Sequence, residues 1–271
     1  MPRVAWLPQP WRRGLRLLLE RSGVQLGFLR LRRKGYALVK GSGLEIGAFE
    51  HPARLSRHCR VEYADVLTRE DALRLFPEIK PSSLRRPDHI LDIDKGGLDV
   101  FAPASMDFVI ACHVIEHVAN PGRFVEELVR LLRPGGLLVI AAPDRDFTFD
   151  RLRPLTPLAT LHRYFLEGRP PVGPEDYRDI VEFITPELLA GPEETVHAAL
   201  ERHYQRREHL SVWTDVTFRD FLIAAFGWCG AQMAPLYEVM SARSRFEYFG
   251  VWELRGRPTA SSPVPETTNA L

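Results

Sequence analysis

Residues 105–117 read Ser105-Met-Asp-Phe-Val-Ile-Ala-Cys-His-Val-Ile-Glu-His117, and residues 131–142 read Leu131-Leu-Arg-Pro-Gly-Gly-Leu-Leu-Val-Ile-Ala-Ala142. Each stretch contains a short apolar run, at 107–112 and at 137–142. Between the runs, Pro121 stands where a helix can start, and apolar residues from Phe124 to Leu132 recur on one helical face. Two short apolar runs joined by an amphipathic helix predict two buried parallel strands with a helical crossover.

The same alternation continues on both sides of this stretch. Further strands are predicted at 43–47, 60–65 and 89–93, and an antiparallel pair at 237–242 and 246–254. Helices are predicted from Thr68, where Asp71 has the spacing of a capping box, and over 214–226. The fold class predicted is therefore α/β: a Rossmann-like, mostly parallel sheet of seven strands with a C-terminal antiparallel hairpin and a helical cap insertion.

Three segments depart from the alternation and suggest the domain organisation. Residues 1–40 form a basic, helical N-terminal segment, and the proline-rich tail at 258–271 is predicted to be disordered. The α/β domain then occupies 41–257. Within it, residues 150–212 are rich in proline, arginine and histidine and form a substrate-cap insertion, with helices expected near 155–167 and 193–207.

Composition narrows the class of protein. Hydrophobic residues make up 45% and charged residues 26%, which is ordinary for a globular domain. No apolar run approaches the roughly 20 residues that a membrane span needs, so no transmembrane segment is expected. The three cysteines, Cys59, Cys112 and Cys229, are far apart and favour a reducing, cytoplasmic location over a disulfide framework.

The net charge of +1 hides an asymmetry. Residues 1–40 contain ten Lys or Arg and one acid, Glu20, together with Trp6 and Trp11. The favoured interpretation of this segment is a solvated helix packed by its leucines. Contact with an acidic partner or an anionic membrane surface is an alternative, and an organellar transit peptide is a further one. Nucleic acid is an unfavoured partner because no RNA-binding module is recognisable.

Polar side chains follow the predicted strands where each one ends. Gly47 ends the first strand, where a missing Cβ lets a ligand approach the backbone, and Asp65 ends the second, where an acid can accept from two ribose hydroxyls. Asp92 and Asp94 flank the end of the third strand, where a carboxylate can accept from an adenine amino group. Each acid alone also suits a helix cap or a polar strand end.

Three ionisable residues follow the fourth strand: His113, Glu116 and His117. Ionisable groups at the end of a central strand are costly unless they are used or paired. Histidine titrates near neutrality and can take a proton from an attacking hydroxyl, so this trio predicts a general base. For each residue, a side chain satisfied by backbone groups is the alternative.

Six segments together resemble the class I S-adenosylmethionine (SAM)-dependent methyltransferases, most closely the ubiquinone/menaquinone-type branch known as methyltransferase domain 11. The resemblance covers residues 40–150 strongly. The segments are Leu44-Glu-Ile-Gly47, Tyr63-Ala-Asp65, Ser105–Ile110, His113–His117, Leu131–Gly136 and Pro143–Asp150.

The resemblance implies SAM as the cofactor and assigns roles to residues. Glu45, Gly47 and Ala48 would meet its methionine part and Asp65 its ribose. Asp94 would contact the adenine, with Asp92 as the second choice, and His113 would lie beside the sulfonium. One departure is that the usual glycine-rich loop is Gly47-Ala-Phe-Glu-His-Pro52 here, with a single glycine.

A nicotinamide-dependent oxidoreductase is the weaker reading of the same strands. It would carry three glycines in the first turn, to bring a helix N-terminus against a pyrophosphate. Glu50 in that turn would repel a pyrophosphate, whereas SAM has none and carries a sulfonium cation.

For the reaction, we expect O-methylation of a hydroxyl of a sugar, glycan or other small molecule. By analogy with sugar O-methyltransferases of the family, His117 is the first choice for the base and Asp144 for its partner, with His113 and Glu116 beside them. No metal is predicted, although a metal-assisted variant using Glu116, His117 and Asp144 stays open. His209, Trp213 and Tyr177 are among the residues expected to line the acceptor pocket or to pack the cap. The alternatives are an N- or C-methyltransferase acting on a lipid or quinone, a protein or RNA, and an inactive methyltransferase-like scaffold.

Overall fold

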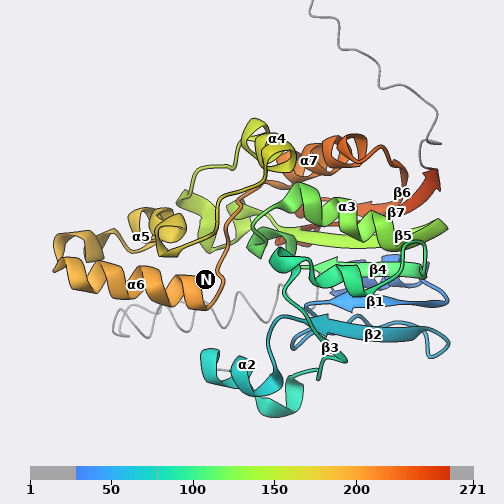
Figure 1. The fold of residues 1–271 in the computed structure, drawn as a ribbon, viewed down its shortest axis with the longest axis horizontal. Helices are drawn as coiled ribbons and strands as arrows, with labels where there is room; N and C mark the ends of the chain where they lie inside the picture. Colours follow the sequence, from blue (N-terminus) through green and yellow to red (C-terminus); the bar gives the residue numbers. More distant parts are fainter. Residues whose placement is uncertain (1–28, 78, 257–271) are drawn as a thin grey trace, which may run out of the picture.

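Seven strands form one sheet in the computed structural model, which describes residues 29–77 and 79–256 (Figure 1). The strand order is β3-β2-β1-β4-β5-β7-β6. The strands are β1 (Ser42–Ile46), β2 (Arg60–Asp65), β3 (His89–Ile90), β4 (Met106–Cys112), β5 (Leu132–Pro143), β6 (Gln232–Val239) and β7 (Glu247–Gly256).

The sheet is parallel from β3 to β5 and antiparallel at its C-terminal edge. β1 pairs in parallel with β2 and β4, β2 with β3, and β4 with β5. β7 runs antiparallel to both β5 and β6, which makes the last two strands a hairpin around α8 (Ser241–Ser244). The predicted fold class is confirmed: a mostly parallel seven-stranded sheet with an antiparallel C-terminal pair.

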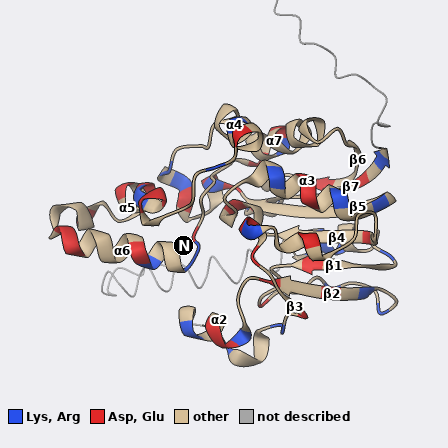
Figure 2. Cartoon of the chain, viewed as in Figure 1, with Lys and Arg blue, Asp and Glu red and all other residues tan. Residues whose placement is uncertain are grey.

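Helices cover both faces of the sheet, and each face has its own apolar core. On one face, α3 (Pro121–Leu131) and α7 (Asp215–Trp228) pack on β1, β4 and β5. The second core lies on the other face and contains Phe108, Ile110 and Phe249 of the sheet. Tyr36, from the helical residues 29–36, and Val39, just after them, pack into this core. The central strands β4 and β5 carry charge only near their beginnings, as Figure 2 shows, because both of their faces are buried.

The N-terminal segment is described only in part. Residues 29–36 are helical, whereas residues 1–28 lie outside the described part of the chain, and so does the tail for which disorder is predicted. Tyr36 is 6% exposed and Val39 is 1% exposed. The described end of the basic segment therefore packs as part of the sheet domain.

The insertion between β5 and α7 is helical. It contains α4 (Leu158–Glu167), α5 (Arg178–Ile184) and α6 (Glu193–Gln205). α4 packs against the sheet domain, with His162 and Phe165 on Trp228 of α7. α5 and α6 project beyond the sheet on the side where β4 and β5 end (Figure 1). The insertion therefore extends past the edge at which the predicted site residues gather.

Three local details differ from the sequence prediction: the length of β3, the start of β5 and the presence of α5. β3 spans only two residues, because the chain turns at Asp92 into a 3-10 turn, Ile93–Lys95. β5 begins at Leu132, so Arg133–Gly136 form part of the strand and not the end of the helix. α5 was not predicted, and among the described residues no helix joins β1 to β2. The capping box is present at α2 (Arg69–Leu75), where Thr68 accepts from Asp71 N.

Short 3-10 turns complete the secondary structure. They are Pro81–Ser83, Gly97–Val100, Ile115–His117, Arg145–Phe147, Phe149–Leu152, Pro174–Tyr177 and Pro186–Ala190. None of the helices in the described part of the chain combines the length and apolar character that a membrane crossing requires.

A buried ion pair ties the helical residues 29–36 to the sheet. Arg32 Nε donates to Glu247 Oε1 of β7 over 2.8 Å, and the two residues are 6% and 1% exposed. Arg32→Ala leaves the Glu247 carboxylate buried beside one cation fewer, so we expect a loss of about 3–5 kcal/mol in the free energy of unfolding, measured by urea titration. Arg74→Ala, which removes a side chain that is 71% exposed, should change it by less than about 0.5 kcal/mol. Equal effects would show that the buried pair does not hold this helix.

Candidate functional site

The predicted residues meet at the sheet edge where the parallel strands end. β1 ends at Ile46, in register with Ala64 of β2 and Ala111 of β4, and Asp65 pairs with Ile90 of β3. Glu45, Asp65, Asp94 and His113 therefore leave neighbouring strands at the same edge. Ligands of open α/β sheets bind at this edge.

The turn after β1 keeps a glycine-type backbone with only one glycine. Gly47 has φ +66°, and Phe49 has φ +44°, a left-handed conformation that is unusual for a bulky residue. A Cβ on Gly47 would lie 2.6 Å from Val114 Cγ2, so this position also lacks room for a side chain. The Phe49 ring meets Phe76 edge-on at 5.4 Å, which helps to hold the strained turn. Ala48, between Gly47 and Phe49 in the sequence, is 9% exposed.

Glu45 is a buried acid with one unpaired oxygen. The residue is 3% exposed, and its Oε1 accepts from Ala53 N over 2.8 Å, whereas Oε2 is buried without a hydrogen-bond partner. Burial raises the pKa of Glu45 to about 7, against the opposing effect of the Ala53 N–H group. A cationic ligand group would relieve this carboxylate.

The acids after β2 and β3 differ in how they are paired. Burial raises the pKa of Asp65, whose Oδ1 accepts from Leu67 N. Burial also raises the pKa of Asp94, which accepts from Ala119 N. For Asp92, partial burial acts in the same direction, but Arg207 donates to both of its oxygens, over 3.2 and 2.7 Å, and lowers its pKa. Asp92 is thus already hydrogen-bonded by the insertion, while Asp94 has only a longer ion pair with Arg207, over 3.8 Å, and burial still dominates the pKa of Asp65 and Asp94.

His113 lies between two buried carboxylates. Its Nε2 is 2.6 Å from Glu247 Oε2 and its Nδ1 is 3.4 Å from Glu116 Oε1. Burial would lower the pKa of His113, but Glu116 and Glu247 outweigh it and raise the pKa to about 9. The ring stacks on Phe246. His113 is therefore an imidazolium at neutral pH, which suits charge pairing and not proton abstraction.

His117 presents an unprotonated nitrogen. Its Nδ1 lies 2.6 Å from the carbonyl oxygen of Arg207, and because a carbonyl only accepts, Nδ1 carries the proton. Burial lowers the pKa of His117 well below its ordinary value, although a third of the side chain stays exposed. Its Nε2 therefore carries a lone pair, and it lies 3.8 Å from Glu116 Oε1.

A second histidine, His209, approaches the same carboxylate from the insertion. Its Nδ1 is 2.6 Å from Asp150 Oδ2 and its Nε2 is 3.9 Å from Glu116 Oε1. The rings of His117 and His209 meet edge-on at 4.8 Å. The main-chain oxygen of Glu116 accepts from Leu210 N and Ser211 N, which fixes this segment on the turn after β4.

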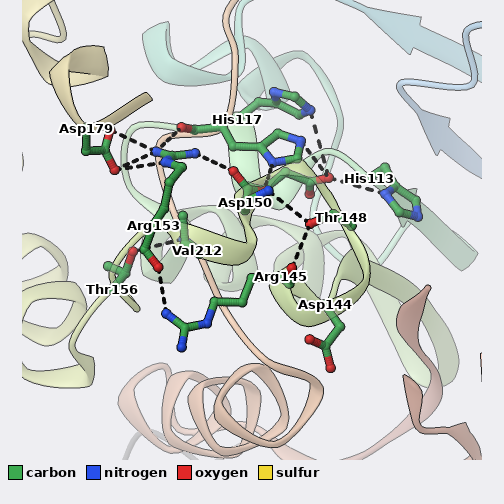
Figure 3. Close-up of polar contacts among 12 residues, drawn as sticks. His113, His117, Asp144, Arg145, Thr148, Asp150, Arg153, Thr156, Asp179 and Val212 are labelled. Atoms are coloured by element: carbon green, nitrogen blue, oxygen red, sulfur yellow. Dashed lines mark hydrogen bonds and ion pairs between the residues drawn. The ribbon is translucent and has the colours of Figure 1, made fainter. Parts of the chain in front are cut away.

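Asp150 is itself held by a buried arginine. Arg153, which is 1% exposed, donates to Asp150 Oδ1 over 2.7 Å, to both oxygens of Asp179 and to the carbonyl of His209. Figure 3 shows Arg153 between Asp150 and Asp179, with the histidine rings on the far side of Asp150. This chain of contacts orients the His209 ring.

Asp144, which the sequence suggests as the partner of His117, has other partners. Its two oxygens accept from Asp146 N, over 2.8 Å, and from Asp215 N, over 3.0 Å, at the start of α7. In Figure 3 it lies away from His117, and within residues 29–77 and 79–256 no hydrogen bond or ion pair joins the two. Here the backbone oxygen of Arg207 orients His117, and Asp144 anchors the return of the chain from the insertion into α7.

Sequence reasoning missed the partners that the insertion supplies. His209 was noted only as a pocket residue, and Asp150 only as part of a family motif. They are 59 residues apart, and nothing in their local sequence signals that they meet. Of the pocket residues expected, Tyr177 and Trp213 are each 1% exposed: Tyr177 packs on Tyr204 within the insertion, and Trp213 packs on Phe218 and Phe221 of α7. Phe149, in contrast, is 49% exposed and lies against His209.

Comparison with known proteins shows that part of this chain is similar to methyltransferases. A family model described as a methyltransferase domain matches residues 79–140. A probable S-adenosylmethionine-dependent methyltransferase of Mycolicibacterium smegmatis is 43% identical over 58 residues, 21% of this chain and 23% of that protein. A ubiquinone biosynthesis O-methyltransferase of a Caulobacter species is 35% identical over 95 residues, 34% of each chain. The chain thus spans about a quarter to a third of the length of these relatives. The resemblance to class I SAM-dependent methyltransferases is confirmed.

Solved structures of methyltransferases are also similar at low identity. A SAM-dependent methyltransferase from Aquifex aeolicus matches 86% of this chain and 93% of its own, with 11% identity and a TM-score of 0.43. The N-methyltransferase NodS from Bradyrhizobium japonicum, in complex with S-adenosylhomocysteine, matches 87% of each chain with 16% identity and a TM-score of 0.39.

The raised pKa of Glu45 predicts how the free energy of unfolding depends on pH. Because the folded state favours the protonated acid, its stabilising contribution is complete below pH 4.5 and is lost as the pH rises through 7. Glu45→Gln keeps an acceptor for Ala53 N and does not titrate. We expect the wild type to lose about 3 kcal/mol relative to this variant between pH 4 and pH 8, measured by urea unfolding.

The exposed acid Glu70 of α2 supplies the control for this titration. Glu70→Gln should follow the pH profile of the wild type throughout. Parallel profiles for the wild type and Glu45→Gln would show that Glu45 is not an unpaired buried acid.

Proposed function

We propose that this chain is a SAM-dependent methyltransferase that methylates a hydroxyl group of a small acceptor, and that His117 removes the hydroxyl proton. The observation that carries the proposal is that buried acids with raised pKa values and the unprotonated Nε2 of His117 lie at one sheet edge. The family match to residues 79–140 and the names of the relatives support the cofactor and the type of reaction.

The described residues suit the parts of SAM. The unpaired, buried Oε2 of Glu45 fits the ammonium of the methionine part, beside the turn at Gly47 and Ala48. Asp65 fits the ribose hydroxyls, and Asp94 fits the adenine better than Asp92, because Arg207 already pairs Asp92. The negative charge of these acids would attract the sulfonium cation of SAM and would repel the pyrophosphate of a dinucleotide.

Bound SAM supplies a methyl carbon on a sulfonium, whose sulfur keeps the electron pair of the broken bond. The protein has to orient the acceptor in line with that carbon and remove its proton. His117 Nε2 takes the proton because Nδ1–H already donates to Arg207 O. His113 is charged and held by Glu247, so we assign it, with Glu116, to positioning and to the electrostatics beside the sulfonium.

The acceptor class is the finer part of the proposal. A sugar or glycan is supported by the exposed ring of Phe149 beside His209, since sugars stack on aromatic rings. A phenolic hydroxyl of a quinone precursor is the second candidate, because relatives matched over a third of this chain are named ubiquinone biosynthesis O-methyltransferases. The domain division, with residues 150–212 as the cap of a domain at 41–257, and a cytoplasmic location are further parts of the proposal.

Cofactor binding is the first test. Isothermal calorimetry should show micromolar binding of SAM and S-adenosylhomocysteine to the full chain, and Asp65→Ala should weaken it at least tenfold by removing the ribose acceptor. Asp220→Ala, which alters an exposed acid of α7, is the matched control and should bind as the wild type does. Absence of binding to the intact chain would favour the inactive scaffold.

The role of His117 is tested on turnover with the best acceptor from a panel of sugars and phenols. His117→Ala should keep cofactor affinity and lower kcat at least tenfold, because the proton acceptor is lost. His197→Ala alters an exposed histidine of α6 and should leave kcat unchanged. An unchanged rate in His117→Ala would remove this residue from the mechanism.

A further inference from the structure

We propose that Glu116, His117 and His209 form a binding site for one divalent transition-metal ion. The three residues come from the turn after β4 and from the segment that precedes α7. One donor atom of each, a carboxylate oxygen and two ring nitrogens, lies within 4.8 Å of the other two. No other such group of His, Cys, Asp or Glu occurs in the part of the chain that the structure describes.

The hydrogen bonds of the two histidines leave the same nitrogen available. His117 Nδ1 faces a carbonyl oxygen and His209 Nδ1 faces the Asp150 carboxylate, so each Nδ1 donates its proton outward. Both Nε2 atoms then point at Glu116. Histidines that ligate metals are held in this way, with the second ring nitrogen donating to a carbonyl or carboxylate.

Glu116 is the unusual member of the group. It is fully buried, and neither of its side-chain oxygens has a hydrogen-bond partner. The imidazolium of His113 lies 3.4 Å from Oε1 and compensates its charge, but Glu247 already shares that imidazolium at 2.6 Å. A cation held between this buried carboxylate and the two Nε2 atoms would stabilise its charge.

The spacing is close to that of a bound ion. Donors about 2.0–2.2 Å from a tetrahedral ion are separated by roughly 3.4 Å. Oε1 of Glu116 lies 3.8 Å from His117 Nε2 and 3.9 Å from His209 Nε2, and the three donor atoms all lie within 4.8 Å of one another, so the donors have to draw together to hold an ion. The buried contacts of Asp150 with Arg153 fix the orientation of His209, which leaves the ring pre-set for ligation.

The ligand set indicates the class of metal. Two imidazoles with one carboxylate suit zinc, iron or cobalt, whereas magnesium and calcium prefer all-oxygen sites. Three protein ligands leave at least one position open for an exchangeable oxygen. This part of the inference rests on the proposed function: the bound oxygen would be that of the acceptor hydroxyl, whose pKa the ion would lower. The hydroxyl proton would then pass to solvent water, because the metal occupies His117 Nε2.

The test uses the full chain, stripped of metal by dialysis against a chelator. Addition of Co²⁺ should give visible absorption from nitrogen and oxygen ligation that saturates at one Co²⁺ per chain. Zn²⁺ should displace the bound Co²⁺ and abolish this absorption. His209→Ala and Glu116→Gln should each weaken Co²⁺ binding at least tenfold, while His197→Ala, which alters an exposed histidine of the same insertion, should bind as the wild type does. His209→Ala supplies the decisive result if Glu116→Gln does not fold, as judged by circular dichroism.

Failure of this inference can be told apart from failure of the proposed function. A chain that binds SAM but gives no cobalt absorption, or gives the same absorption in His209→Ala, has no metal site here and relies on His117 alone. A chain that binds cobalt through these residues but binds no SAM supports the metal site and overturns the proposed cofactor. Chelation that lowers kcat in the wild type and is reversed by Zn²⁺ would connect the two.

Discussion

Burial of charge around β7 and the turn after β4 is the constraint on which the rest of the site depends. Arg32, Glu247, His113 and Glu116 alternate in sign from the helix at 29–36 to the end of β4. An isolated buried charge costs several kcal/mol, so each member is tolerable only because its neighbours have the opposite sign. This series of charges fixes His113 as a cation. Glu116, its last member, has two buried side-chain oxygens without a hydrogen-bond donor.

The helical insertion completes the site because it is held at this point. The carbonyl oxygen of Glu116 accepts two backbone N–H groups of the segment after α6, and Arg207 of the same segment pairs with Asp92. One segment therefore contacts the acid after β3 and the turn after β4, and presents His209 between them. A change in the position of the insertion would alter the proposed cofactor edge and the histidine pair together.

The sheet could be predicted from the sequence because its signals are local. Apolar runs at 107–112 and 137–142, strand ends marked by Gly47 and Asp65, and a cap at Thr68 each involve a few adjacent residues. The site was predictable only where it follows a strand directly, as for His113, Glu116 and His117. The pairing of Asp144 with His117 was not found, because the N–H groups of Asp146 and Asp215 occupy the two Asp144 oxygens, and the position of Asp144 after β5 does not reveal these partners. His209 with Asp150, and Arg32 with Glu247, are long-range pairs that no periodicity encodes.

The two sides of the edge differ in their charge balance, and that difference fits the proposed reaction. On the side of the proposed cofactor, burial raises the pKa values of Glu45, Asp65 and Asp94 and outweighs the opposing effect of the nearby arginines. A sulfonium-bearing ligand brings the missing positive charge, and methyl transfer removes it. Under the proposed function, these acids attract the cofactor more strongly than its neutral-sulfur product, which favours release after turnover. On the proposed acceptor side, Glu116 has two buried oxygens without a hydrogen-bond partner and His117 carries a lone pair on Nε2. A proton or a metal ion would relieve this excess of acceptors.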